Sequence, residues 1–459
     1  MNSARNALLQ KYKPVMEIHE GLNRQVVGFR GVVNTPIYNW YKYKEAFSCD
    51  LVTYFINRYA PHLENLLDPF AGIGTTLWTA RQTRCHFQGG ALKGIDILPI
   101  GKFVIDSKLA AERVDQDQLC TQIVFLERQF PTNISFSEQF PSNISIINGA
   151  FPEQNQFDLD AYLTYCESIT NMDLKQIMRF AAFCVLEECS YTSKDGSYLR
   201  WDKRSNHASR PSKNGAFEKK IIKAFKKAVV LKLSDIHCAM KFNTKYDDPI
   251  NIQTASVFAQ LPVEPDNFYD CIITSPPYCN RYDYTRTYAL ELAFLKCTSD
   301  DIKRLRQQLL TCTVETLEKP DNVLSTIDSR LNRIRSIYDN CEAMQEVNEA
   351  MVRLRVGGHL NNQNVVRMVR NYFLEMCFVI DDMRRVIKTG KRIIMVNDNV
   401  RYVNEEVPVD LLLSYFAEQC GMRVERIFIL PRGKGNSSQQ MAKFGRTELR
   451  KCVYVWTKQ

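Results

Sequence analysis

Short apolar runs alternate with longer amphipathic stretches in the first quarter of the chain. Residues 50–59 have the spacing of an amphipathic helix, the run at 65–67 reads as a strand, and 75–80 opens a second helix. A further apolar run at 92–96 ends on an acid, Asp96. Strands that alternate with helices in this way predict a parallel sheet with crossover helices.

The alternation stops near residue 110 and returns near residue 248. We expect the later strands at the following apolar runs: 251–253, 271–273, 392–396, 424–429 and 451–456. The two intervening segments lack this alternation of strands and helices. One contains a helical stretch at 174–188, and the other is helical, with Asp300 and Asp301 at a helix start.

This pattern predicts an α/β fold with a doubly wound, mostly parallel sheet and helical insertions. The expected division is a core in three parts with two insertions between them: core 1–110, insertion 111–246, core 247–297, insertion 298–370 and core 371–459.

Composition places the 459 residues among ordinary globular proteins, with 45% hydrophobic and 24% charged residues. No apolar run approaches the ~20 residues that cross a bilayer, and the first residues lack a signal-peptide pattern, so we expect a cytoplasmic protein without membrane contact. The 15 cysteines include no Cys-x-x-Cys pair. Reduced thiols, with no metal site, are the expectation.

A glycine-rich turn follows the first strand, in the motif Asp68-Pro69-Phe70-Ala71-Gly72-Ile73-Gly74-Thr75-Thr76. Its glycines remove side chains where the backbone turns sharply against a ligand, and the following helix offers free N–H groups to a carboxylate. Asp96, at the end of the next strand, can accept both hydroxyls of a ribose. A nucleotide-binding fold of another kind has the same glycines, so the flanking residues carry the specificity of the motif.

A second motif, Thr274-Ser275-Pro276-Pro277-Tyr278, follows the apolar run at 271–273. Two successive prolines fix the backbone and leave carbonyl groups free, because neither residue has an N–H to satisfy. The tyrosine offers a flat face on which a base can stack. As an isolated tetrapeptide the motif is an ordinary turn, and its meaning comes from the preceding strand and the glycine motif.

Together the two motifs resemble those of the DNA amino-methyltransferases, and among them the cytosine-N4 group, for which Ser-Pro-Pro-Tyr is typical. The resemblance covers the N-terminal third and the C-terminal half of the chain. It implies a Rossmann-like class I methyltransferase fold whose last strand runs antiparallel. It also implies S-adenosylmethionine as cofactor and double-stranded DNA as partner, with a cognate restriction endonuclease or another defence-system partner as a candidate.

The resemblance assigns cofactor binding to Asp68, Pro69, Phe70, Ala71, Gly72, Gly74, Thr75, Thr76, Asp96 and Phe47. Asp68 would face the ammonium group of the cofactor. Phe47 and Lys44 are in the place of an N-terminal contact segment, although the proline usual there is absent; a plain helix lead-in is the alternative. Relatives often have an acid after the third strand to meet the adenine, whereas this chain has Thr254-Ala255-Ser256.

Catalysis is assigned to Ser275, Pro276, Pro277 and Tyr278. The Ser275 hydroxyl and the Pro276 carbonyl would accept protons of the target amine, and Tyr278 would stack on the flipped base. Methyl transfer is then direct and in line. Cytosine-C5 enzymes need a nucleophilic cysteine after a proline; Cys279 follows Tyr278, so a packed residue is the expectation.

The most basic region, from Lys194 to Lys232, combines cations with aromatic residues, as phosphate contact requires, and the net charge of the chain is +9. The candidate DNA contacts are Arg200, Lys203, Arg204, Arg210, Arg281 and Arg432. A solvated basic helix at 219–232, a loop ion pair of Arg281 or Asp283, and a plain hairpin around Arg432 are the alternatives. Because the recognition region of similar enzymes lies between the two motifs, we assign it to 111–246, with 298–370 as helper or competitor.

The sequence therefore predicts a bacterial or archaeal DNA methyltransferase that makes N4-methylcytosine, cytoplasmic and associated with the nucleoid, in restriction-modification or defence. Three alternatives stay open. They are an adenine-N6 enzyme, an RNA guanine-N2 enzyme with similar Pro-Pro-Tyr chemistry, and an inactive DNA-binding subunit of a defence complex.

Overall fold

The computed structural model describes residues 3–23, 26–32, 34–83, 90–132, 135–141, 144–195, 198–201, 222–243, 246, 248–431, 445 and 447–459. An eight-stranded sheet forms its centre, in the order β1-β11-β12-β8-β7-β2-β3-β6. The strands are β1 (Met16–Ile18), β2 (Leu66–Asp68), β3 (Leu92–Asp96), β6 (Ile250–Thr254), β7 (Tyr269–Thr274), β8 (Ile387–Asp398), β11 (Met422–Ile429) and β12 (Lys451–Lys458).

Five neighbouring strands of this sheet, β8, β7, β2, β3 and β6, are parallel. Strand β12 runs antiparallel between β8 and β11. The doubly wound, mostly parallel α/β fold is thus confirmed, and so is the antiparallel last strand. Strand β1 was not predicted. It is a three-residue edge strand beside β11, and its Met-Glu-Ile sequence has no apolar run to reveal it.

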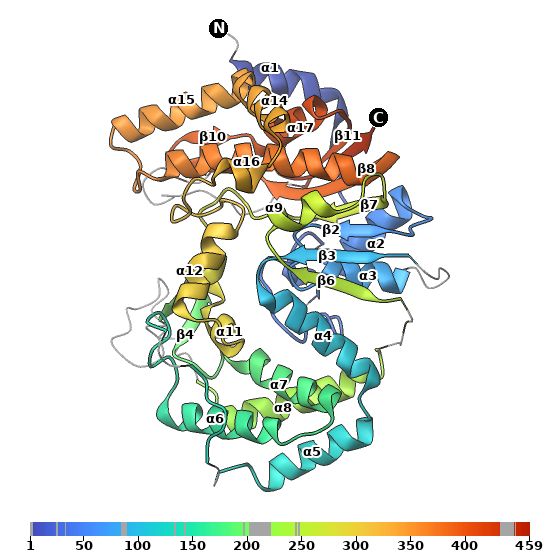
Figure 1. The fold of residues 1–459 in the computed structure, drawn as a ribbon, viewed down its shortest axis with the longest axis vertical. Coiled ribbons are helices and arrows are strands. Elements are labelled where there is room, and N and C mark those ends of the chain that lie inside the picture. The colour runs from blue at the N-terminus through green and yellow to red at the C-terminus, as the bar shows by residue number, and fades with distance from the viewer. Residues whose placement is uncertain are drawn as a thin grey trace.

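Helices cover both faces of the sheet (Figure 1). In chain order they are α1 (Ala4–Tyr12), α2 (Cys49–Tyr59), α3 (Thr75–Thr83), α4 (Pro99–Arg113), α5 (Gln116–Arg128), α6 (Glu153–Glu167), α7 (Met172–Val185), α8 (Phe225–Met240), α9 (Val257–Gln260), α10 (Tyr284–Thr287), α11 (Ala289–Phe294), α12 (Ser299–Gln308), α13 (Asp321–Leu324), α14 (Asp328–Asp339), α15 (Glu342–Val356), α16 (Val365–Val386) and α17 (Val409–Gln419).

Successive sheet residues point alternately into two separate hydrophobic cores. On β8, Ile393 and Met395 belong to the core under α16 and α17, whereas Ile394 and Val396 belong to the core that includes α2 and α4. This two-faced burial explains why the central strands read as continuous apolar runs in the sequence. Two hydrophobic faces need two helical layers, and the alternation of strands and helices supplies them.

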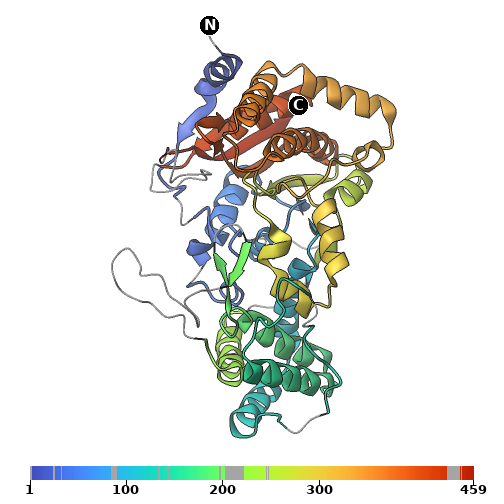
Figure 2. The same ribbon diagram turned by 90° about the vertical axis from the view of Figure 1, so that its left-hand side faces the viewer.

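Helices α5 to α8 form a layered group at the opposite end of the molecule from α14 to α17 (Figure 1). A hairpin of β4 (Thr192–Asp195) and β5 (Tyr198–Trp201) lies between this group and the sheet (Figure 2). A second short hairpin pairs β9 (Val400–Tyr402) with β10 (Glu405–Val407). Among the helices described, none is long and apolar enough to cross a membrane.

Candidate active site

A cavity of about 860 Å³ opens at the carboxyl ends of the parallel strands. Ligands of open α/β sheets bind at this edge, because loops from several strands meet there. The sheet order gives the cavity a direction. It runs from Asp398 on β8, past Ser275 after β7 and Asp68 on β2, to Asp96 on β3 and Ala255 after β6.

Most of the predicted cofactor and catalytic residues meet in this single cavity. Those that line it are Phe47, Asp68, Pro69, Phe70, Ala71, Gly72, Thr75, Asp96, Ser275, Pro277 and Tyr278. The predicted residues Gly74, Thr76 and Pro276 are not part of its wall. Residues more than 200 positions apart in the sequence thus share one site, as the two motifs together predict.

Asp68 ends strand β2 with its carboxylate buried beneath the cavity. The carboxylate accepts hydrogen bonds from the Thr76 and Thr274 hydroxyls, each at 2.7 Å, and from the Phe70 N–H at 3.1 Å. Burial nevertheless raises its pKa to about 6. Within the described part of the chain no cation pairs with this carboxylate, and a buried carboxylate that hydroxyl groups hold suits a positively charged ligand.

Asp96 ends strand β3 and fixes the glycine turn from the other side. Its carboxylate accepts the Gly72 N–H and the Leu98 N–H, both at 2.8 Å, and burial raises its pKa to about 7. Gly72 has a φ of +51°, and a Cβ there would lie 3.1 Å from the Tyr43 ring. Glycine is therefore required for both the turn and the close approach of the neighbouring loop.

Gly74 serves packing rather than ligand contact. A Cβ at this position would lie 2.4 Å from Ile105 Cδ1 on helix α4, so the glycine lets α4 pack against the turn. Thr76 is equally indirect, because its buried hydroxyl positions the Asp68 carboxylate. In the same way, a Cβ on Gly101 would lie 1.9 Å from the Gly72 carbonyl oxygen. Gly74, Thr76 and Gly101 thus determine the shape of the turn without lining the cavity.

The Ser-Pro-Pro-Tyr segment leaves β7 and enters the cavity beside Asp68. Pro276 and Pro277 are buried, whereas Ser275 and Tyr278 are half-buried. The Ser275 hydroxyl lies 3.4 Å from the Tyr278 hydroxyl, to which it donates. Burial raises the pKa of Tyr278, so its phenol stays protonated at neutral pH. The segment presents neutral oxygen atoms and an aromatic side chain to the cavity.

Cys279 is fully buried, and its carbonyl oxygen accepts the Tyr402 hydroxyl. Burial raises the pKa of its thiol to about 12, which keeps the thiolate from forming near neutral pH. This cysteine is therefore a packed residue, as the sequence indicates, and it is unsuited to nucleophilic attack.

Several cavity residues were not predicted. Asp398, at the carboxyl end of β8, pairs with Lys451 at the start of β12, and both line the cavity. The sequence signal for Asp398 is its place two residues after the predicted apolar strand at 392–396. Gln308, Leu309 and Leu310, from the helical segment 298–370, form part of the wall together with Ala255. No local pattern marks these three residues, because they reach the site through tertiary packing.

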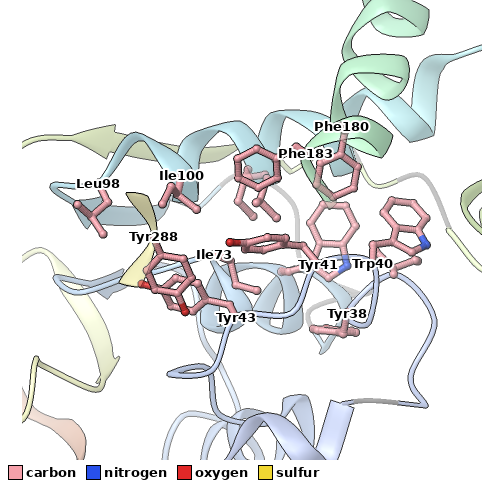
Figure 3. Packing of buried hydrophobic residues seen from close by; sticks show 14 of the residues in the cluster. Tyr38, Trp40, Tyr41, Tyr43, Ile73, Leu98, Ile100, Phe180, Phe183 and Tyr288 are labelled. Atoms are coloured by element: carbon pink, nitrogen blue, oxygen red, sulfur yellow. The ribbon is translucent and has the colours of Figure 1, made fainter. Parts of the chain in front are cut away.

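Aromatic residues link the cavity wall to the β4–β5 hairpin. Tyr43 stacks on Tyr288 with ring centroids 4.8 Å apart, and the two rings lie side by side in Figure 3. The Tyr288 hydroxyl donates to Glu45, whose pKa burial raises. Lys194, on β4, lies over the Tyr288 ring at 4.8 Å and pairs with the buried Glu291. The cavity-lining segment 42–47 (the N-terminal cavity segment) is thus connected through Tyr288 to Lys194 of the hairpin.

The predicted DNA contacts are more dispersed. Arg200 is an exposed residue of β5, and Arg281 donates a hydrogen bond of 2.7 Å to Asn361. Arg281 also has a φ of +67°, at the rim of the catalytic segment. Four predicted contacts lie outside the described residues: Lys203, Arg204, Arg210 and Arg432. Arg281 joins the chain just after the Ser-Pro-Pro-Tyr segment to the loop before α16, whereas Arg200 belongs to the hairpin.

The site can hold a nucleoside that carries a positive charge. Asp96 is placed for a ribose, Asp68 for a cationic group, and Leu98, Val257 and Leu309 offer apolar surface at the β6 end. The described residues contain no group of three or more histidine, cysteine or acidic side chains arranged to hold a metal ion.

Known proteins are similar to this chain along nearly its whole length. Type II methyltransferase M.AvaI of Nostoc sp. and its namesake of Anabaena variabilis are each 42% identical over 98% of the chain and 92% of their own length. Type II methyltransferase M.BsoBI of Geobacillus stearothermophilus is 36% identical over 98% of the chain and 91% of its own. No family model matches the chain, and no solved structure is significantly similar to it.

Proposed function

The chain belongs to the type II methyltransferases, and from this membership and the cavity geometry we propose that it methylates the exocyclic N4 of cytosine in DNA. The observation that carries the base assignment is Ser275. It places a neutral hydroxyl, rather than a carboxylate or an amide, first in the tetrapeptide that faces the cavity.

S-adenosylmethionine fits the β2–β3 half of the cavity. Its ribose hydroxyls would donate to Asp96, its ammonium group would lie near Asp68, and its adenine would lie against the apolar β6 end. The turn at Gly72 leaves room for a close approach of the ligand to the backbone. When bound, the cofactor supplies an electrophilic methyl group on a sulfonium ion.

Ser275 and the Pro276 carbonyl are the proposed acceptors of hydrogen bonds from the target amine, which they would hold for in-line attack on the methyl carbon. The new N–C bond forms as the S–C bond breaks, and the surplus amine proton leaves to solvent. Tyr278 would stack on the base. The cavity is recessed at the sheet edge, so a base within a duplex must be flipped to reach it.

We assign DNA recognition mainly to the 111–246 segment, with double-stranded DNA as the substrate. Lys194 of its hairpin lies over the ring of Tyr288, which stacks on Tyr43 of the cavity wall, and its basic stretch suits phosphate contact. A restriction endonuclease of the same specificity is the expected companion of such an enzyme. The 298–370 segment contributes to the cavity wall through Gln308 to Leu310, so it supports the cofactor end in this proposal.

The test is methyl transfer in vitro from labelled S-adenosylmethionine to DNA and, separately, to RNA. The nucleic acid is then digested and the labelled nucleoside identified. Label in N4-methyldeoxycytidine supports the proposal. Label in N6-methyldeoxyadenosine overturns the base assignment, and label in RNA alone overturns the substrate assignment.

A further inference from the structure

The cavity extends beyond the catalytic segment to an ion pair that the proposed mechanism does not use. Asp398 and Lys451 are register partners at the end of β8 and the start of β12. Their side chains form a salt bridge, and both line the cavity together with Ser275 and Tyr278. In the sheet, β8 and β12 lie on the side of β7 that is away from β2 and β3. The pair therefore borders the half of the cavity opposite the proposed cofactor half.

The two partners differ in exposure. The Asp398 side chain is 9% exposed, whereas that of Lys451 is 34% exposed. An ammonium group has three N–H donors, so a bond to Asp398 leaves donors that can face the cavity. A lone cation near a sulfonium ion would be repelled, and the paired carboxylate offsets that repulsion. The Lys451 ammonium group can thus donate a hydrogen bond to a base in this half of the cavity without repelling the positively charged cofactor.

Cytosine and adenine both carry the reacting amine next to a ring nitrogen, on the edge that pairs with another base. Next along this edge, cytosine has a 2-oxo acceptor, whereas adenine has a C–H group. A site that hydrogen-bonds a substrate group discriminates strongly against an analogue lacking it, because the polar group of the protein is left unpaired. A lysine donor at this position therefore favours cytosine.

We propose that Lys451, held by Asp398, donates a hydrogen bond to the 2-oxo group of the flipped cytosine and determines the base specificity. This inference rests on the proposed cytosine-N4 activity and adds to it a residue outside the Ser-Pro-Pro-Tyr segment. Ser275 and the Pro276 carbonyl hold the amine, while Lys451 reads the other end of the same edge of the base.

The test first maps the methylated site in genomic DNA treated with the wild-type enzyme. Short duplexes of that site are then made with cytosine, or with a carbon-linked 2-aminopyridine nucleoside, an analogue that keeps the amine and the adjacent ring nitrogen but has a C–H where cytosine has its 2-oxo group. Transfer to both is measured for the wild type, Lys451→Met, Lys451→Arg and Lys388→Met. Lys388 is a matched control: it lies on β8, at the opposite end of that strand from Asp398, it pairs with the carboxylate of Asp270, and its side chain has the same exposure as that of Lys451, 34%.

The wild type should lose about tenfold to a hundredfold in kcat/KM on the analogue. Lys451→Met should lose a similar factor on cytosine and nothing further on the analogue. Lys451→Arg should recover part of the cytosine activity, and Lys388→Met should behave like the wild type.

A wild-type enzyme that methylates cytosine but tolerates the analogue overturns the inference, whether or not any variant folds. Equal sensitivity of Lys451→Met and the wild type to the analogue overturns it as well. In both cases the cytosine-N4 activity stands. Methylation of adenine by the wild type would overturn that proposed activity and this inference together.

Discussion

Asp68 is buried and Asp96 is half-buried in the wall of the cavity, and hydrogen-bond donors hold both carboxylates. Burial outweighs those bonds and raises their pKa values to about 6 and about 7. Their ionised forms are what a cationic ligand and ribose hydroxyls require. In the proposed function, cofactor binding would therefore depend on pH near neutrality, through groups whose ordinary pKa is near 4.

The cofactor affinity should therefore fall as the pH is lowered from 8 to 6. Asp96 takes up a proton through its pKa of about 7 and loses its capacity to accept both ribose hydroxyls. If the ionised form binds, this range weakens binding by about tenfold. Calorimetric titration with S-adenosylmethionine measures it. Asp96→Asn should bind more weakly at pH 8 and lose most of the pH dependence, and an unchanged profile in this variant would contradict the assignment.

Ser275→Ala should separate catalysis from cofactor binding. Without the hydroxyl acceptor, kcat should fall by about a hundredfold to ten-thousandfold. The affinity for S-adenosylmethionine should stay close to wild type, because Asp68 and Asp96 are untouched. Ser234→Ala is the control, since the Ser234 hydroxyl donates to a backbone carbonyl within α8. Loss of cofactor binding in Ser275→Ala would contradict the catalytic role.

At the scale of elements, glycine shapes the turn between β2 and α3 through packing as much as through ligand space. Gly74 has a φ of +73° and lies against Ile105 of α4, which is fully buried. Gly390 in β8 has a similar φ of +76° but nothing within 4 Å of the position of a Cβ. Alanine at position 390 would therefore introduce backbone strain alone, whereas alanine at position 74 would introduce both backbone strain and overpacking.

Gly390→Ala should lower the free energy of unfolding by about 1–2 kcal/mol, the cost of a left-handed alanine. Gly74→Ala should cost about 1–3 kcal/mol more, because its methyl group also displaces Ile105. Denaturant unfolding monitored by circular dichroism measures both. Equal losses in the two variants would show that α4 does not press on the turn.

The core elements could be predicted from the sequence because their strands are buried on both faces and read as apolar runs. Strand β1 escaped prediction because it is short and two of its three residues are exposed. Asp68 and Ser275 were predicted from their motifs, and Asp96 from its place at the end of a predicted strand; all three line one cavity. Asp398 likewise ends a strand, β8, but no neighbouring motif distinguishes it. Lys451 and Gln308 enter the cavity through strand pairing and helix packing, which a single sequence does not encode locally.

At the scale of the whole molecule, the α5–α8 group and the sheet are connected through the β4–β5 hairpin. Buried Lys194 carries this connection to Tyr288 and the N-terminal cavity segment. The basic stretch that follows the hairpin contributes to the net charge of +9. A recognition segment anchored beside the active site would place bound DNA within reach of the cavity.

Replacement of Lys203, Arg204 and Arg210 by glutamine should weaken DNA binding and flatten its salt dependence. Each lost phosphate contact lowers the slope of log K against log salt by about 0.9. Fluorescence anisotropy from 50 to 300 mM salt, on the order of the physiological range, gives the slope. The control replaces Lys102, Lys303 and Arg353, which belong to exposed ion pairs on α4, α12 and α15. Equal slopes for the two triple variants would exclude this stretch from the interface.

The most direct test of the account is the nucleoside composition of DNA from a bacterial host that lacks N4-methylcytosine and expresses this chain. Mass spectrometry of the digested genomic DNA should find N4-methyldeoxycytidine with the wild type and none with Ser275→Ala. A host DNA that gains N6-methyldeoxyadenosine, or gains no methylated base while the expressed protein is folded and binds S-adenosylmethionine, would contradict the account.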